Sequence, residues 1–320
     1  MKFWSNQRIC VTGGCGFLGR HLVRELLDRG ARQIQILDNL SAGSEDWLPA
    51  DPRLQLHIGD IRRPEEVRPA LEGVDLIFHL AAPTDVRAAL RDCRQDIDQG
   101  ILGTATLLEC AHALGIKKLV FASSSCVYGN NPAQPAREKA GALLPASLYG
   151  ASKLAAEGLI SAYCQTFQMQ SWLFRFPNVV GPELTHGVCL DFVRRLQANP
   201  RELEVMGNGQ QRKTYMWVSD CVEGILALVP LMDDTVNLAN VTTRGSSTVR
   251  EIAEMVLNEM GLPQALLQFG TSAQGWPGDV PHITLDDARG AELGWRARYN
   301  SSEALLLTVR SLLQETTRVA

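Results

Sequence analysis

The sequence predicts an α/β fold in which a doubly wound parallel sheet is combined with a smaller C-terminal lobe, interleaved with it in sequence. Three observations support this prediction. At the N-terminus a short apolar strand runs into a glycine-rich loop and a helix. Strands and helices then alternate as far as Ala122, which is typical of a parallel sheet with helices on both faces. Beyond Phe176 the alternation breaks, and a second region begins.

Length and composition narrow the class of protein. The chain has 320 residues, with an apolar fraction of 45% and a charged fraction of 21%, which are ordinary values for a globular protein. A net charge of −4 gives no basic surface for nucleic acid or an anionic membrane. No segment approaches the roughly 18 apolar residues of a membrane span, and no signal peptide is visible. We expect a cytoplasmic protein that binds neither nucleic acid nor membrane.

The cysteines and histidines do not show the spacing of a metal site. Most cysteines stand inside apolar stretches, such as Cys10 in the first strand and Cys110 in a later helix. We expect buried free thiols in a reducing compartment, and no bound metal.

The glycine-rich loop carries a specific signal because of the elements around it. It lies between the expected strand 8–12 and the expected helix 17–29, and the next strand, 33–37, ends in Asp38. A strand, a glycine-rich loop, a helix and a second strand ending in an acid form the fingerprint of a dinucleotide site. The sequence therefore predicts a Rossmann-type fold.

Each position in this loop has a physical role. Gly13 and Gly16 allow the backbone to turn tightly and approach a pyrophosphate, and Gly19 allows close packing of helix and strand. The start of the helix presents N–H groups to the phosphates. Asp38 can accept hydrogen bonds from both ribose hydroxyls of NAD and would repel the additional phosphate of NADP. We therefore expect NAD as the cofactor.

Further strands are expected at 54–58, 74–80 and 118–122, with a helix at 101–114. Ligands of such sheets bind beyond the carboxyl ends of the strands. Those ends carry Asp60, Ala81, Ala82 and the three serines 123–125. Asp60 can bond the adenine amino group, although an Asp after Gly is also a common turn residue.

Tyr149 and Lys153 stand four residues apart, so on a helix both side chains lie on one face. A phenol is a poor base at neutral pH, but a neighbouring ammonium favours the phenolate. Alone, the pair is more simply explained as an amphipathic helix face. Together with the dinucleotide loop and a serine from 123–125, it forms a candidate catalytic set.

These motifs together resemble the extended short-chain dehydrogenase/reductase family, and within it the NAD-dependent nucleotide-sugar epimerases and dehydratases. The resemblance covers nearly the whole chain, and the motifs occur in the order of the family. The matching segments are 12–19, 37–41, 59–61, 79–82, 123–129, 149–153, 175–182, 207–211, 276–279 and 293–295.

The resemblance implies a catalytic set of Ser124, Tyr149 and Lys153. Tyr149 would act as base and acid, Lys153 would lower its pKa and hold the nicotinamide ribose, and Ser124 would bond the reacting sugar hydroxyl. In the implied epimerase cycle, Tyr149 takes the hydroxyl proton while hydride passes to NAD⁺, and hydride then returns to the other face of the keto sugar.

The resemblance also implies the residues that line the two ligands. The cofactor-binding residues would be Gly13, Gly16, Phe17, Leu18, Gly19, Asp38, Asn39, Asp60, Ile61, Leu80, Ala81, Ala82, Ser123, Tyr149, Lys153 and Phe176. The substrate, a nucleotide-diphosphate sugar, would contact Thr84, Ser124, Ser125, Cys126, Tyr149, Asn178, His186, Lys213 and Trp276. For His186 an exposed loop histidine is the competing reading, and for Trp276 a tryptophan that only packs on the surface.

Departures from the family pattern narrow the reaction. Dehydratases of the family carry Asp-Glu after the catalytic Thr, and decarboxylases carry Glu at the second position; here Ser125 and Cys126 stand there. Without that proton-transfer group, epimerisation is favoured over elimination or decarboxylation, and we expect it at C4. A keto-sugar reductase that releases its cofactor and a non-catalytic NAD-sensing regulator remain as alternatives.

Other departures lie at the binding sites. Gly100 replaces the usual Asn before the Gly103-Thr104 segment, Lys213 and Thr214 replace Arg and Asp, and Trp276 replaces an arginine. These changes weaken the expected bidentate diphosphate clamp, because lysine is only a point charge.

We assign residues 1–176 and about 212–239 to the NAD-binding domain, and about 177–211 with 240–320 to the nucleotide-sugar-binding lobe. In the second region we expect a helix over 189–197 and a helix capped by Asp220. The resemblance further implies a homodimer built from residues 94–114 and 149–168 of each subunit.

Overall fold

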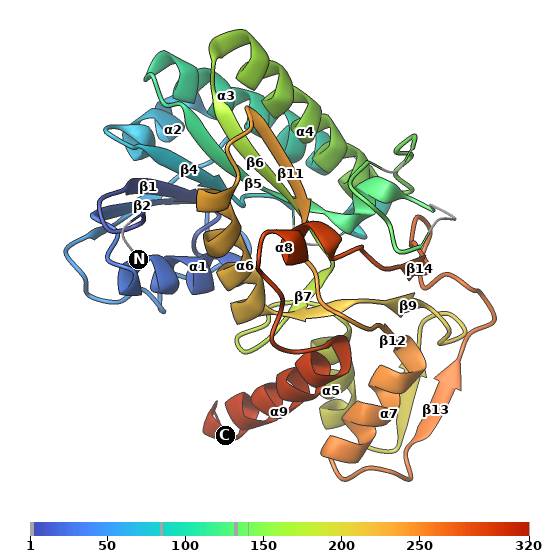
Figure 1. Ribbon diagram of the computed structural model, residues 1–320. Helices are drawn as coiled ribbons and strands as arrows, with labels where there is room; N and C mark the ends of the chain where they lie inside the picture. Colours follow the sequence, from blue (N-terminus) through green and yellow to red (C-terminus); the bar gives the residue numbers. More distant parts are fainter. Residues whose placement is uncertain (1–2, 84–85, 131–133, 140, 320) are drawn as a thin grey trace. The chain divides into compact units, whose positions relative to one another are not determined.

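The computed structural model describes residues 3–83, 86–130, 134–139 and 141–319. Its contacts divide the chain into two compact units. Unit 1 comprises residues 1–127, 148–175 and 225–239, and unit 2 comprises residues 128–147, 176–224 and 240–320. Both units are therefore assembled from segments that are far apart in sequence (Figure 1).

Unit 1 is built on a seven-stranded parallel sheet, which confirms the fold class expected from the sequence. Its strands lie in the order β11-β6-β5-β4-β1-β2-β3. The bounds are β1 Arg8–Thr12, β2 Gln33–Asp38, β3 Leu54–Ile58, β4 Leu76–His79, β5 Lys118–Ser124, β6 Gln170–Phe176 and β11 Val236–Asn240. The order reverses direction at β1, because the chain first builds outward to β3 and then returns to add β4 on the other side of β1. Ligands of doubly wound sheets bind at such a switch point.

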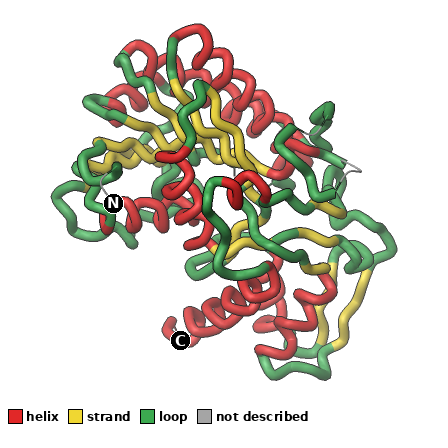
Figure 2. Tube along the Cα trace, in the orientation of Figure 1, coloured by secondary structure: helices red, strands yellow, loops and turns green. Residues whose placement is uncertain are grey.

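Helices cover both faces of this sheet (Figure 2). They are α1 Phe17–Asp28, α2 Pro64–Leu71, the π-helix η2 Asp96–Leu102, α3 Gly103–Ala113 and α4 Leu148–Phe167, with short 3₁₀ turns η1 Ala88–Leu90 and η4 Val229–Leu231. Figure 1 shows α2, α3 and α4 together on one face and α1 on the other.

The core between the sheet and these helices is apolar because the strands are buried on both faces. All four residues of β4 are buried, as are four of the five residues of β1. Helices α2, α3 and α4 each turn an apolar stripe inward, for example Leu71, Leu107 and Ile160. Burial of such side chains stabilises the fold by roughly 25 cal/mol per Å² of apolar area. The result is a rigid support for the loops at the carboxyl ends of the strands.

Unit 2 contains short strands and a cluster of helices. Its elements are η3 Ser125–Tyr128 and α6 Val218–Leu228, which both cross the limit of the unit, and β7 Asn178–Val180, α5 Val188–Ala198, β8 Glu202–Val205, β9 Arg212–Lys213, β10 Tyr215–Trp217, β12 Ser247–Thr248, α7 Val249–Glu259, β13 Leu266–Phe269, β14 His282–Ile283, α8 Ala288–Glu292 and α9 Ser301–Val319. The strands form the sheets β10-β7, β12-β9-β14 and β13-β8. The helix expected over 189–197 is α5, with one more residue at each end.

One local expectation is wrong. Asp220 does not cap α6, because the helix already begins at Val218 and Asp220 lies in its first turn. Its carboxylate instead accepts a hydrogen bond of 2.9 Å from the backbone N–H of Tyr299. The side chain is buried, so it connects α6 to the segment before α9 rather than serving the helix end.

All eight cysteines are free, and six of them are buried, as the sequence analysis expected. Among the described residues, no helix is long and apolar enough to cross a membrane. Within the same residues, His, Cys, Asp and Glu side chains form no group of three or more that could hold a metal ion.

Candidate active site

The glycine-rich loop forms a turn that only small residues fit. Gly13 has a φ of +70°, and a Cβ there would lie 2.7 Å from the backbone N of Ala81. A Cβ on Gly19 would lie 2.2 Å from the carbonyl oxygen of Gly13. The first close approach joins the end of β1 to the loop after β4, and the second seats α1 against β1. The backbone is thereby left accessible to a phosphate at the start of α1.

Asp38, at the end of β2, joins this loop to the next one. One carboxylate oxygen accepts the N–H of Cys15 at 2.9 Å, and the other accepts the N–H of Leu40 at 2.8 Å. Leu40 has a φ of +58°, a left-handed conformation that the bond to Asp38 supports. Each carboxylate oxygen keeps a further lone pair for a ribose hydroxyl. The residues at this end of the sheet therefore fit NAD.

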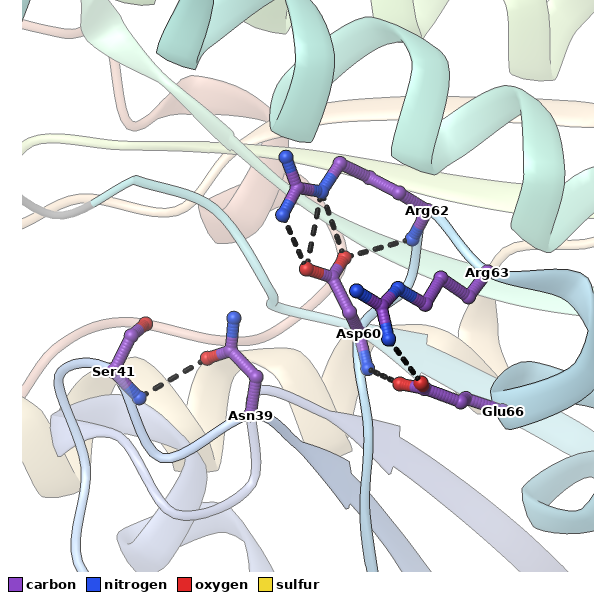
Figure 3. A network of polar contacts seen from close by, with 6 residues as sticks. All are labelled: Asn39, Ser41, Asp60, Arg62, Arg63 and Glu66. Carbon is purple, nitrogen blue, oxygen red and sulfur yellow. Dashed lines mark hydrogen bonds and ion pairs between the residues drawn. The ribbon is translucent and has the colours of Figure 1, made fainter.

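Asp60, after β3, is held by an arginine (Figure 3). The Arg62 guanidinium donates to both carboxylate oxygens, with bonds of 2.5–3.0 Å, and the Arg62 N–H donates to the same group at 2.9 Å. These bonds keep the pKa of Asp60 below its usual value. Glu66 accepts the Asp60 N–H at 2.6 Å. Asp60 therefore has the role of a turn residue in the structure. Its contact with adenine stays a prediction.

A buried histidine joins the ends of β1 and β4. His79 Nδ1 lies 2.8 Å from Thr12 Oγ1, and its Nε2 lies 3.0 Å from Thr104 Oγ1 of α3. The Thr12 hydroxyl also accepts the N–H of Ala81. Burial lowers the pKa of His79 to about 3, so the ring is neutral. This network fixes the carboxyl ends of β1 and β4, next to the residues expected to bind the dinucleotide.

The candidate catalytic side chains come together at the end of β5. Tyr149 and Lys153 lie one turn apart near the start of α4, with the Lys153 ammonium 5.8 Å from the centre of the Tyr149 ring. Ser124 closes β5 and hydrogen-bonds Tyr149, and its Oγ also accepts the N–H of Cys126 at 3.2 Å. The geometry thus brings together the three residues that the sequence analysis named.

Lys153 is buried, and its ammonium has close partners. Its side chain is 4% exposed, its Nζ donates to the carbonyl of Ala122 at 2.7 Å, and the ammonium lies over the ring of Phe121. Burial lowers the pKa of Lys153 to about 8, while Glu157, Cys126 and Asp96 oppose the change. Lys153 therefore keeps its proton at neutral pH but is close to losing it.

Tyr149 is half buried as a whole residue. Burial raises the pKa of Tyr149, and the charge on Cys126 raises it further, whereas the hydrogen bond from Ser124 lowers it. Without a ligand the phenol is therefore protonated at neutral pH. A positively charged ring beside it would favour the phenolate, which is the form needed for a base.

The sequence did not predict the ion pair between Glu157 and Arg175, which lies next to the candidate catalytic residues. Glu157, one turn after Lys153, forms two bonds with Arg175 of β6, and its Oε1 accepts the hydroxyl of Ser123 at 2.5 Å. Ser123, expected near the cofactor, is buried and donates to this carboxylate. The spacing of four residues between Lys153 and Glu157 was a visible signal, because it places both on one face of the helix.

The expected substrate residues beyond Phe176 lie in unit 2. Asn178 of β7 donates to the carbonyl of Thr214, and Lys213 forms an ion pair with Asp279. Asp279 also accepts the N–H of Gly275, so it belongs to the turn that carries Trp276. Asp279 thus links Lys213 to the turn of Trp276, and it compensates the positive charge of Lys213. His186 contacts the hydroxyl of Thr185. Thr84 lies outside the described residues.

The fold and this set of side chains define a class: an NAD-binding Rossmann-type protein with the Ser-Tyr-Lys arrangement of a short-chain dehydrogenase/reductase. Residues 9–241 match the NAD dependent epimerase/dehydratase family, and the chain belongs to it. The family assignment and the cofactor expected from the sequence are thereby confirmed.

Three relatives illustrate the range of the family. A crystal structure of a UDP-galactose 4-epimerase is 35% identical, with a TM-score of 0.87 over 96% of this chain and 99% of that one. A putative UDP-glucose 4-epimerase of Methanocaldococcus jannaschii is 29% identical over 93% of this chain and 95% of its own. UDP-glucuronic acid decarboxylase 1 of Arabidopsis thaliana is 31% identical over 93% of this chain and 68% of its own. Epimerases and decarboxylases are thus similar to this chain at comparable levels.

Proposed function

We propose that this protein is an NAD-dependent epimerase of a nucleotide-diphosphate sugar, acting at C4. The observation that carries the proposal is the meeting of Ser124, Tyr149 and Lys153 beside Cys126, where a dehydratase or decarboxylase of the family has an acid. The same side chains supply a base, an acid and a hydrogen bond to one sugar hydroxyl.

The dinucleotide end of the site is suited to hold NAD through three groups of this chain. The start of α1 offers N–H groups to the phosphates, Asp38 accepts from the adenosine ribose, and Lys153 bonds the nicotinamide ribose. When bound, NAD supplies a reversible hydride acceptor at the reacting carbon. Because Asp38 carries a negative charge and is 8% exposed, it disfavours a phosphate on that ribose.

Tyr149 and Ser124 perform the proton chemistry. Ser124 orients the reacting hydroxyl and Tyr149 accepts its proton as that carbon is oxidised to a ketone; Tyr149 then returns the proton when the carbon is reduced on its other face. Lys153 stabilises the phenolate between these two events. Its pKa of about 8 means that this support weakens in alkaline solution.

Epimerisation needs no further proton-transfer residue, whereas elimination and decarboxylation do. Position 126 is the one that decides, because its backbone N–H bonds the Ser124 hydroxyl and so lies beside the reacting group. A thiol there is half buried and is not a general acid of the strength of Glu. Cys126 therefore supports epimerase over decarboxylase, although relatives of both kinds are similar to this chain.

Two further proposals concern the ligand and the assembly. We assign substrate contacts to Asn178, His186, Lys213 and Trp276 of unit 2. There Lys213 and Asp279 form a neutral pair rather than a cationic clamp.

We also propose that the protein forms a homodimer through residues 94–114 and 149–168, and that it is cytoplasmic. Gel filtration with light scattering tests the dimer.

The test of the activity is incubation with UDP-, dTDP- and GDP-sugars without added cofactor, followed by NMR of the products. An epimer that accumulates to equilibrium is expected. Tyr149→Phe should reduce the rate by about 10²–10⁴, the usual contribution of general acid–base catalysis. Tyr163→Phe, the same deletion on the same helix, is the matched control. Turnover that requires stoichiometric NADH would show a reductase instead.

A further inference from the structure

An acidic side chain that plays no part in the mechanism above is buried next to the catalytic pair. Asp96 is the first residue of the π-helix η2, and it is 2% exposed. Its Oδ1 makes no hydrogen bond to any residue that the structure describes. Burying an unpaired carboxylate is costly, so a position of this kind persists where the charge has a partner or a task. π-Helical segments also occur frequently at functional sites.

The packing of η2 directs this side chain towards α4. Gly100, in the middle of η2, lies so close to α4 that a Cβ there would be 2.7 Å from the hydroxyl of Ser152. Ser152 lies between Tyr149 and Lys153 in the sequence. Asp96 precedes Gly100 by about one helical turn, so it lies on the same side of η2. The resemblance expects Asn at position 100, and this chain has no side chain there.

Two other ionisable groups around Lys153 are already paired or neutral. The carboxylate of Glu157 is already shared between Arg175 and Ser123. His79 of β4 is neutral, and Cys126 of η3 is the other titratable group among the described residues that acts on both Lys153 and Tyr149. Burial raises the pKa of Asp96, and the charge of Lys153 opposes this rise. The charge of Asp96 in turn raises the pKa of both Lys153 and Tyr149.

We propose that Asp96 is a positioning residue of the Tyr149–Lys153 pair: its buried carboxylate holds the Lys153 ammonium charged and in place beside the phenol. The proposal rests on the proposed function for its catalytic meaning. Its physical content is independent of any substrate.

A negative charge near two ionisable groups raises the pKa of both. Removing the charge of Asp96 therefore lowers the pKa of Lys153 and the pKa of Tyr149 together. If activity needs the phenolate and the ammonium, both limbs of the pH–rate profile move to lower pH. A side chain with a merely structural role would reduce the height of the profile and leave its limbs in place.

The direct test is NMR of the protein with ¹³C-labelled lysine side chains, in which Lys153 is identified by the signal missing in Lys153→Met. In the wild type, Lys153 should titrate near pH 8. Asp96→Asn should move this titration down by about one unit or more, and Asp96→Glu should restore most of it. The matched control is Asp98→Asn, which removes the same charge from the same helix, where Asp98 pairs with Arg94. An unchanged Lys153 titration in Asp96→Asn overturns the proposal.

A reciprocal measurement covers the case in which Asp96→Asn does not fold. In protein with ¹³C-labelled aspartate, Lys153→Met should move the titration of Asp96 to higher pH. Burial raises the pKa of Asp96, and the variant removes the Lys153 charge that opposes this rise. If the titration of Asp96 does not respond to the loss of Lys153, the two groups are not coupled and the proposal is wrong. Neither measurement uses turnover, so a failure of the proposed activity would be recognised separately.

Discussion

The Arg175 guanidinium and the Glu157 carboxylate form a buried bidentate pair. The Nη2–Oε2 distance is 2.7 Å, the Nε–Oε1 distance is 2.9 Å, and the two side chains are 3% and 7% exposed. The pair joins β6 to α4 one turn beyond Lys153, and so fixes the helix face that carries the catalytic residues.

Glu157→Gln should destabilise the protein by about 3–5 kcal/mol, because it leaves the Arg175 charge buried without a partner. Urea unfolding measures the effect. Glu25→Gln is the control, since Glu25 forms a surface pair with Arg29 that should contribute only ~0.5 kcal/mol. Similar losses in the two variants would contradict the structural role of the buried pair.

Glycine-to-alanine changes in two helices should have opposite effects. Gly19→Ala in α1 places a Cβ 2.2 Å from the carbonyl oxygen of Gly13 and should impair folding or NAD binding. Gly158 in α4 has open space around its Cβ position, and Gly158→Ala should stabilise the protein by roughly 0.5–1 kcal/mol through helix propensity. Thermal unfolding and NAD titration measure both. Normal NAD binding by Gly19→Ala would refute the close packing of the loop.

The buried neutral His79 predicts a loss of stability in acid. Its pKa is about 3 in the folded protein and about 6.5 when unfolded, so between these values only the unfolded chain binds the proton. Stability is therefore fully present above about pH 6.5 and falls as the pH decreases. From about pH 6 to about pH 5, the wild type should lose about 1 kcal/mol more than His79→Asn. Equal slopes of unfolding free energy against pH would show that folding does not lower the pKa of His79.

If Asp38 binds the adenosine ribose as proposed, Asp38→Ala should relax the preference for NAD over NADP, because it removes a negative charge that would face the additional phosphate. The ratio of the two dissociation constants should change by roughly tenfold or more, corresponding to at least about 1.4 kcal/mol. Fluorescence titration with both cofactors measures the ratio. Absolute affinity should also fall, since Asp38 holds the N–H groups of Cys15 and Leu40. An unchanged ratio would contradict the role in cofactor selection that we assign to Asp38.

The fold of unit 1 was predictable because its signals are local. The glycine-rich loop, the alternation of strands and helices, and the four-residue spacing of Tyr149 and Lys153 each depend on residues near one another in sequence. The strands start and end within a few residues of the expected positions, for instance β4 at Leu76–His79 against an expected 74–80.

What sequence reasoning missed depends on contacts between distant segments. Arg175 meets Glu157 from another element, and Asp220 bonds Tyr299 far along the chain. Asp96 gave no signal, because an acid near a helix start is ordinarily a solvated residue. Its burial follows from the glycine at position 100 and from the close approach of η2 to α4.

The central claim is that one carbon is oxidised and then reduced within a single bound substrate. The most direct measurement is incubation of UDP-glucose carrying deuterium at C4, in ordinary water and without added cofactor, followed by NMR and mass spectrometry. The account predicts an equilibrium with UDP-galactose in which the deuterium stays at C4, or the same retention with the nucleotide sugar that the panel identifies. An epimeric product that has lost the label at that carbon would contradict it.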